Sequence, residues 1–323
     1  MKAETFIDFY RNWIKTVPDG HPCEIIWHGG EPTLIGREFF VEVLRECREI
    51  TPPEKEVSHC LQTNAVSIDQ AWADLFLEHN VLVGVSMDGP KWLHDKQRIR
   101  EKGQGTFDQA IRGYKILETS GLDVGIVVVV NKSNVNLPRE IFAFMQEFGI
   151  KRIQLSPCLE LVEDKDPYSI TPEAYSVFIK QLFETWVASG DPDVSIGVIS
   201  DFIDHLHSNA HYNCMLSDRC HNFAVLDHTG HVKTCDGMGT RQVDFGDIGL
   251  DPANSSFKEA WKKHHDDIST TRTENCSTCE WVDICHGGCP YHWPDDGVAK
   301  TAFCSAHKDM FSYMANRLTE LQH

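Results

Sequence analysis

The sequence has no long hydrophobic run, and no stretch approaches the roughly 18 apolar residues that a transmembrane helix needs. No hydrophobic signal-peptide core follows a basic N-terminal stretch, because residues 1–10 already have a helical pattern. Basic residues are few, with 30 Lys and Arg against 48 Asp and Glu, which gives a net charge of −18. Bulk electrostatics therefore do not attract nucleic acid or an anionic membrane, and we expect neither as a partner.

Cysteine is abundant, and its distribution is uneven. Without an export signal, we expect no disulfide framework among the twelve cysteines, and we expect metal binding or catalysis instead. Eight of them crowd between residues 214 and 304, while Cys23, Cys47, Cys60 and Cys158 are scattered over the first half. We expect two domains, a cysteine-poor one over residues 1–195 and a cysteine-dense one over residues 196–323.

Strand and helix patterns alternate through the first part of the chain. Near-continuous apolar strands in such an alternation predict an α/β fold with a parallel sheet or barrel. Polar or small residues end each strand, and in parallel α/β folds the carboxyl ends of the strands carry the ligand site. The predicted strands are 23–28, 57–64, 81–88, 124–130 and 150–156, and the predicted helices are 37–50, 69–79, 107–119, 138–148 and, at the C-terminus, 305–321.

The second part has the spacing of metal ligands. Four thiols lie within 14 residues in the pattern C-x2-C-x5-C-x3-C, which is strong evidence for a metal. With the cysteines on either side, eight thiolates suffice for two four-coordinate sites. Such sites select zinc or iron–sulfur clusters, and spacing alone does not separate the two. The eight are Cys214, Cys220, Cys235, Cys276, Cys279, Cys285, Cys289 and Cys304.

Two sets of motifs resemble a known family. The segment Trp27-His-Gly-Gly-Glu-Pro-Thr-Leu34 is followed in order by Gln62-Thr-Asn, Ser86-Met-Asp-Gly-Pro, His94-Asp and Arg98. The second set lies in the cysteine-dense part and consists of C-x9-G-x4-C, then C-x2-C-x5-C-x3-C, and then a last Cys. The whole resembles radical S-adenosylmethionine (SAM) enzymes with a SPASM extension, and most of all anaerobic sulfatase-maturating enzymes. This resemblance implies a (β/α)6 barrel, SAM, and two auxiliary [4Fe–4S] clusters.

One motif of that family is missing. Radical SAM enzymes carry C-x3-C-x2-C after the first barrel strand, and its thiolates hold the cluster that cleaves SAM. This sequence has no such motif. We therefore expect a partial barrel without its first strand, truncated at the N-terminus or, as an alternative, naturally derived without that cluster. A third [4Fe–4S] cluster is expected only where the missing segment is present, and this chain alone is expected to be inactive.

The resemblance assigns residues to SAM. Gly29, Gly30, Glu31 and Pro32 would lie against its amino group, where glycines allow close backbone approach. Ser86 would contact the ribose or carboxylate, Arg98 would pair with the carboxylate, and Leu159 would lie near the adenine. Taken alone, the two glycines could form a simple turn, and Arg98 could form a surface salt bridge with Asp95 or Glu101.

The resemblance also assigns the clusters and a catalytic base. Cys214, Cys220, Cys235 and Cys289 would hold the first auxiliary cluster, and Cys276, Cys279, Cys285 and Cys304 the second. Asp236 would be the proton acceptor, since a carboxylate beside an apolar wall can have its pKa raised to a useful value. A turn before Gly237 is the structural alternative for Asp236.

The expected activity is that of an oxidoreductase that converts a Cys or Ser of a sulfatase to Cα-formylglycine. The expected partners are that protein or peptide substrate and an electron donor such as a ferredoxin or flavodoxin, in an anaerobic cytoplasm. Two other functions stay open: a SPASM maturase that crosslinks a peptide, and a non-catalytic iron–sulfur chain that binds a peptide.

Overall fold

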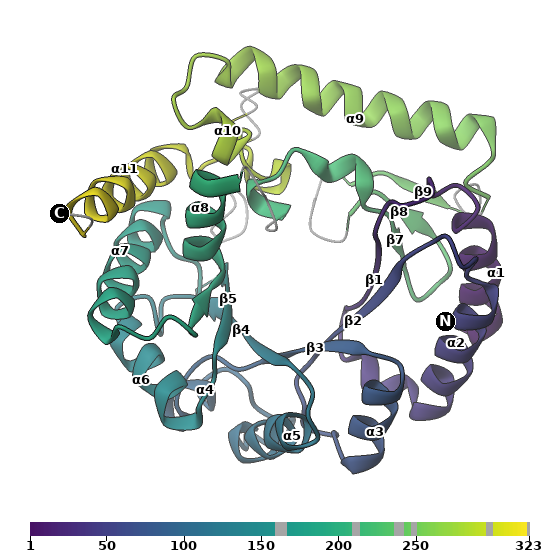
Figure 1. Ribbon diagram of the computed structural model, residues 1–323, viewed down its shortest axis with the longest axis horizontal. Helices are drawn as coiled ribbons and strands as arrows, with labels where there is room; N and C mark the ends of the chain where they lie inside the picture. The colour runs from purple at the N-terminus through teal and green to yellow at the C-terminus, as the bar shows by residue number, and fades with distance from the viewer. Residues whose placement is uncertain (159–166, 209–213, 236–241, 247–250, 295–299, 322–323) are drawn as a thin grey trace. The chain divides into compact units, whose positions relative to one another are not determined.

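The central feature of the fold is a sheet of six strands in the order β1-β2-β3-β4-β5-β6, which is also their order along the chain (Figure 1). The computed structural model describes residues 1–158, 167–208, 214–235, 242–246, 251–294 and 300–321. Within this six-stranded sheet, each strand pair with a described register is parallel. The predicted fold class, α/β with a parallel sheet, is therefore confirmed.

Two compact units make up the chain. The first combines Met1–Ser86 with Asp108–Val124 and Cys220–His265, and the second combines Met87–Phe107 with Gly125–Arg219 and Asp266–His323. Each unit thus draws on both halves of the sequence. The division predicted between residues 195 and 196 stays a prediction.

The first unit is built on strands β1 (Cys23–Trp27), β2 (Val57–Thr63) and β3 (Val81–Ser86). Buried residues alternate with more exposed ones along β2 and β3, so one sheet face packs on helices and the other is more accessible. Its helices include α1 (Ala3–Trp13), α2 (Arg37–Ile50), α3 (Gln70–Glu78) and most of α5 (Phe107–Thr119). A small antiparallel sheet is formed by β7 (Val225–Leu226), β8 (Val232–Lys233) and β9 (Asp244–Gly246).

A glycine lets α5 approach the loop after β2. A Cβ on Gly113 would overlap the backbone oxygen of Ala65, so only glycine allows this close contact. Ala65 itself has a φ of 56°, in the left-handed region. The loop that follows the predicted Gln-Thr-Asn motif is thereby fixed against a helix.

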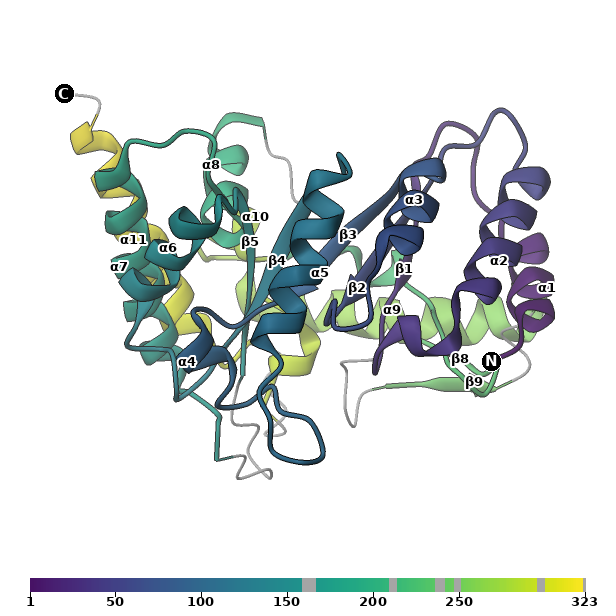
Figure 2. The ribbon, with the colours of Figure 1, turned by 90° about the horizontal axis from the view of Figure 1, so that it is seen from below.

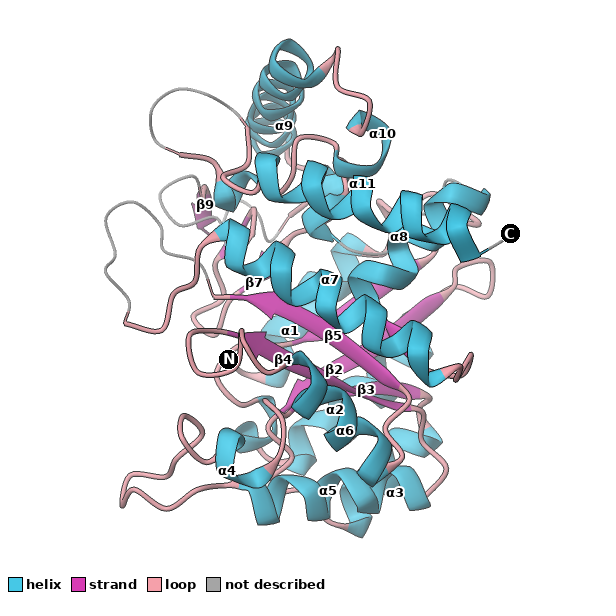
Figure 3. Ribbon diagram, turned by 90° about the vertical axis from the view of Figure 1, so that its left-hand side faces the viewer, coloured by secondary structure: helices cyan, strands magenta, loops and turns pink. Residues whose placement is uncertain are grey.

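The second unit contains β4 (Val124–Val130) except for its first residue, β5 (Arg152–Pro157) and the short β6 (Ser195–Ile196). Its helix α7 (Pro172–Ser189) packs against both α6 (Pro138–Phe148) and α11 (Cys304–Leu321), as Figure 2 shows. In Figure 3, α6 and α7 lie over the strands of this unit. The unit also contains the long helix α8 (Gly197–Ser208) and the short helices α4 (Lys91–His94) and α10 (Val282–Cys285). The long helix α9 (Ser255–Cys276) is divided between the two units.

The five predicted strands and five predicted helices are all present, with ends shifted by at most two residues. The structure adds α1 in full, α7, α8, α9, β6 and the antiparallel sheet. Among the described residues, no helix is long and apolar enough to span a membrane.

Candidate functional site

Glu31 anchors the turn after β1. It precedes the 3-10 helix η1 (Pro32–Ile35), and its carboxylate accepts hydrogen bonds from the backbone N–H of Thr33 at 3.1 Å and the hydroxyl of Thr33 at 2.7 Å. It also accepts from the Thr63 hydroxyl and the Asn64 backbone N–H, both at 2.7 Å. Two of these four hydrogen bonds brace the turn itself, and the other two tie it to the end of β2.

The two glycines of this turn face open space. Gly29 and Gly30 have φ of 92° and 50°, a region that disfavours other residues. Within the described residues, a Cβ on either glycine would meet no atom within 4 Å. The backbone here is therefore accessible to a ligand, while Pro32 starts η1 in the position that suits its fixed φ.

Ser86, at the end of β3, is held by the neighbouring strand. The amide of Gln62 donates to the Ser86 hydroxyl oxygen at 2.9 Å. Gly84 makes this possible, because a Cβ there would overlap the Gln62 side chain. The Ser86 hydroxyl hydrogen is not used in this contact, so the hydroxyl can still donate to a ligand.

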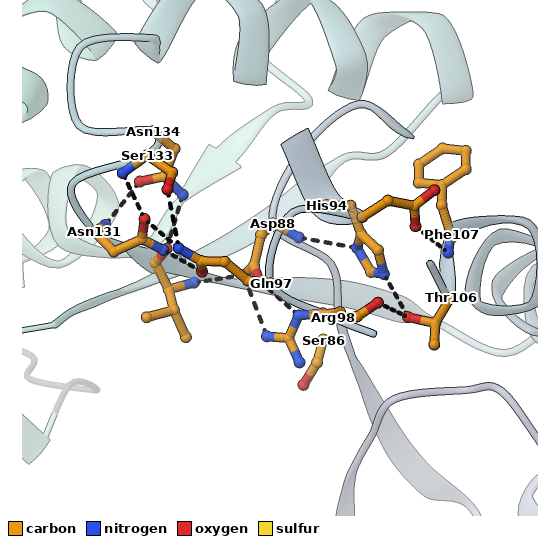
Figure 4. A network of polar contacts seen from close by, with 12 residues as sticks. Ser86, Asp88, His94, Gln97, Arg98, Thr106, Phe107, Asn131, Ser133 and Asn134 are labelled. Carbon is orange, nitrogen blue, oxygen red and sulfur yellow. Dashed lines mark hydrogen bonds and ion pairs between the residues drawn. The ribbon is translucent and has the colours of Figure 1, made fainter. Parts of the chain in front are cut away.

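Arg98 is paired with a buried carboxylate in the second unit (Figure 4). Its Nε and Nη2 donate to the two Asp88 oxygens at 2.6 and 3.2 Å, a two-point contact that suits a planar guanidinium. Asp88 Oδ1 also accepts from the backbone N–H of Val129 at 2.9 Å. The Asp88 side chain is only 5% exposed, against 25% for Arg98. Arg98 is thus fastened to the end of β4, and not to Asp95 or Glu101.

A chain of hydrogen bonds through His94 fixes the same loop. The imidazole is fully buried, and burial lowers its pKa to about 4, so it is uncharged at neutral pH. The Asp88 backbone N–H donates to Nδ1 at 3.4 Å, which assigns the ring hydrogen to Nε2. Nε2 then donates to the Thr106 hydroxyl at 3.0 Å, and that hydroxyl donates to the Arg98 carbonyl at 2.9 Å.

Asp95 has a separate structural task. Its carboxylate accepts from the backbone N–H of Phe107, the first residue of α5, at 2.9 Å. A Cβ on Gly105 would overlap this carboxyl group, which explains the glycine at that position. The Asp95 carboxylate therefore caps the N-terminus of α5.

Paired amides hold the loop that follows β4. Gln97 Nε2 donates to Asn131 Oδ1 at 2.9 Å, and Asn131 Nδ2 donates back to Gln97 Oε1 at 2.8 Å. Asn134 donates to the Val129 carbonyl at 2.8 Å and accepts from the Asn131 backbone N–H at 2.7 Å (Figure 4). The polar strand ends predicted at Asn131 and around Ser86 are thus part of rigid hydrogen-bond networks.

Four of the predicted ligand thiols lie together in the second unit. Cys276 ends α9, Cys279 follows in a turn, Cys285 ends α10 and Cys304 begins α11. Burial raises the pKa of Cys285 to about 12, and Cys304 and Cys276 raise it further. Burial, Cys304 and Cys279 likewise raise the pKa of Cys276. All four side chains are partly exposed. In the thiolate form, such cysteines are the donors that iron–sulfur clusters require.

A left-handed backbone segment wraps this thiol group. His286, Gly287 and Gly288 have φ of 48°, 78° and 72°. A Cβ on Gly287 would lie 3.4 Å from the Cys276 sulfur, and the Gly287 carbonyl accepts from Trp293 Nε1 at 3.1 Å. Buried Arg272 donates to the Gly288 carbonyl at 3.2 Å. Backbone amides in such a wrap can bond to the sulfurs of a cluster.

The other four predicted ligands are divided between the units. Cys220, in η3 (Arg219–Asn222), and Cys235, after β8, belong to the first unit. Cys214, in η2 (Cys214–Leu216), and Cys289, before η6 (Pro290–His292), belong to the second. Among the described residues, no group of three or more Cys, His, Asp or Glu is arranged to hold a metal ion. The assignment of all eight cysteines therefore stays a prediction.

Asp236 and Leu159 lie outside the described residues. Two further residues at these sites, Asp88 and His307, have no role predicted from the sequence. Asp88 sits within the Ser-Met-Asp-Gly-Pro motif, so its place in the motif was the available signal. His307 follows Cys304 at a spacing of three, which puts both on one helix face. Its Nδ1 lies 3.2 Å from the Cys285 sulfur.

Comparison with known proteins gives matches over most of the chain. The model of the radical SAM superfamily matches residues 12–145. A cysteine-type anaerobic sulfatase-maturating enzyme from Clostridium novyi is 29% identical over 92% of this chain and 82% of its own length. A serine-type anaerobic sulfatase-maturating enzyme from Bacteroides thetaiotaomicron is 25% identical over 89% of this chain and 72% of its own length.

Solved structures agree with these matches. Native anSMEcpe with bound AdoMet superposes with a TM-score of 0.87 at 27% identity, covering 99% of this chain and 90% of that one. The same enzyme with AdoMet and the Cp18Cys peptide gives 0.86 at 26% identity, covering 99% and 91%. Residues 12–145 thus match the radical SAM superfamily, and over most of its length the chain is similar to anaerobic sulfatase-maturating enzymes, one of which has bound AdoMet in its structure.

Proposed function

We propose that the protein to which this sequence belongs oxidises a Cys or Ser side chain of a sulfatase to Cα-formylglycine in a SAM-dependent reaction. The observation that carries the proposal is the similarity to cysteine-type and serine-type sulfatase-maturating enzymes over 92% and 89% of the chain. The similarity to an anSMEcpe structure with bound AdoMet and a peptide supports the proposal that this protein also binds SAM and a peptide substrate.

The residues around the strand ends would bind and orient SAM. The exposed backbone of Gly29 and Gly30 would accept hydrogen bonds from its amino group, and Glu31 would hold that turn in place. Ser86 has a free hydroxyl hydrogen for the ribose or carboxylate. Arg98 keeps N–H donors beyond the two that Asp88 accepts, so it can also bind a ligand carboxylate.

The cysteines and Asp236 would serve the oxidation. The bound cofactors would supply a radical that removes a hydrogen atom from the substrate Cβ and an acceptor for the electron that follows. Asp236 would take the proton from the thiol or hydroxyl of the same side chain. These losses turn Ser directly into the aldehyde, whereas Cys would give a thioaldehyde that water hydrolyses to the aldehyde with release of hydrogen sulfide. The sequence contains no C-x3-C-x2-C motif, so none of its residues is proposed as a ligand of the SAM-cleaving cluster.

The test is product analysis with the complete gene product. The protein is loaded anaerobically with iron and sulfide, then incubated with SAM, a reductant and sulfatase peptides that contain Cys or Ser. We expect mass spectrometry to find an aldehyde at that residue, and Asp236→Asn to lose it at unchanged iron content. The matched control is Asp8→Asn, whose side chain is 74% exposed on α1 and which should keep full activity. A crosslinked peptide, or SAM left uncleaved, would refute the proposal.

A further inference from the structure

A histidine next to the cysteine group has no role in the proposed oxidation. His307 lies one helical turn after Cys304 on α11, and its Nδ1 is 3.2 Å from the sulfur of Cys285 on α10. The imidazole is only 8% exposed. His307 thus places a hydrogen-bonding side chain against the sulfur of Cys285, one of the four predicted ligands of a cluster.

Packing holds the imidazole in this orientation. Its ring stacks on Phe303 with centroids 5.3 Å apart and an angle of 10°, and it contacts Phe311 at 5.6 Å. Its backbone N–H donates to the carbonyl of Phe303, the residue before α11, at 2.7 Å. A side chain fixed on two faces loses little further entropy on making a hydrogen bond, so the contact with Cys285 is pre-formed.

The chemistry of the sulfur sets the direction of this hydrogen bond. A thiolate that binds a metal has no hydrogen, so Nδ1 must carry the hydrogen and donate it. A donated hydrogen bond stabilises negative charge on sulfur, and a reduced cluster carries one more negative charge than an oxidised one. In a buried site this stabilisation is larger than in water.

We propose that His307 donates a hydrogen bond to the Cys285 thiolate of an iron–sulfur cluster held by Cys276, Cys279, Cys285 and Cys304, and that it raises the reduction potential of this cluster. The inference rests on the proposed cluster and does not depend on the substrate. His307 would then act as a positioning residue that makes reduction of this cluster more favourable.

The test compares reduction potentials in the complete protein. Anaerobic titration followed by electron paramagnetic resonance should show one midpoint potential moved to a more negative value in His307→Leu, with the other clusters unchanged. Cys279→Ser should perturb the same signal and thereby identify the cluster. His307→Asn, which places an amide N–H near the position of Nδ1, should restore part of the shift.

The control is His292→Phe. His292 is buried against the same Phe303 ring, 5.1 Å from it, so this variant tests general disruption of the packing without removing the contact to Cys285. Unchanged potentials in His307→Leu, or equal shifts in His307→Leu and His307→Asn, would overturn the proposal. Iron and sulfide analysis separates the two possible failures. A deficit in the wild-type protein refutes the cluster itself, whereas a full complement with no shift refutes the role of His307.

Discussion

Replacing Asp88 should show how strongly the loop after β3 is held. Asp88→Ala removes two hydrogen bonds from Arg98, at 2.6 and 3.2 Å, and one from the Val129 backbone N–H at 2.9 Å. Breaking a buried ion pair by removing one partner costs about 3–5 kcal/mol. Because Arg98 is a quarter exposed, water can solvate it in part, and we expect about 3 kcal/mol, the lower end of that range.

The assay is urea unfolding under anaerobic conditions, together with hydrogen exchange at the Val129 amide. The transition midpoint should fall at constant slope, and exchange of the Val129 amide should become faster. A double-mutant cycle with Arg98→Met should give a coupling energy above about 1 kcal/mol. The matched control is the exposed pair of Asp8 and Arg11 at 2.9 Å, which should couple by less than about 1 kcal/mol. A loss under about 1 kcal/mol for Asp88→Ala, or additive effects with Arg98→Met, would show that the pair is not a structural anchor.

Three further predictions concern other buried contacts. Gly113→Ala should destabilise the protein by about 1–3 kcal/mol through overlap with the Ala65 carbonyl, and an unchanged melting temperature would contradict this. Tyr175→Phe should be neutral or stabilising, since the buried hydroxyl has no partner within the described residues; a loss above about 1 kcal/mol would reveal one. Burial lowers the pKa of His59 and His94 to about 4 from 6.5, so both take up protons on unfolding below pH 6.5. The unfolding free energy should therefore fall as the pH drops from 6.5 to 4, by up to about 1.4 kcal/mol per pH unit for each, and an equal slope in His94→Gln would refute the assignment to His94.

The regular part of the fold could be predicted because its signals are local. Buried β-branched strands such as Val124–Val130 and helix starts such as Pro138 are visible in a few residues of sequence. Helix α7 was missed although Thr171 caps it, Pro172 opens it and Gly190 ends it in a left-handed conformation. Strand β6 has two residues, which is too short for any periodicity to be detected.

The sequence could predict which residues form the candidate site, but not which of them form hydrogen bonds or ion pairs with one another. The motifs identified the polar strand ends, yet sequence distance favoured Asp95 or Glu101 as the partner of Arg98. In the structure, Asp95 accepts a hydrogen bond from the first N–H of α5, and Asp88 pairs with the guanidinium of Arg98. Such choices depend on which groups the folded loop brings within about 3 Å, and spacing along the chain does not contain that information.

The two interpretations of Arg98 are compatible once its donors are counted. A guanidinium presents five N–H groups in a rigid fork, and Asp88 accepts from Nε and from Nη2. Among the described residues, Nη1 and the second Nη2 hydrogen remain for another acceptor, in the plane that suits a second carboxylate. The buried Asp88 therefore does not compete with a ligand. It fixes the direction of the fork, so an anionic ligand would meet an arginine that is already oriented and has little entropy left to lose on binding.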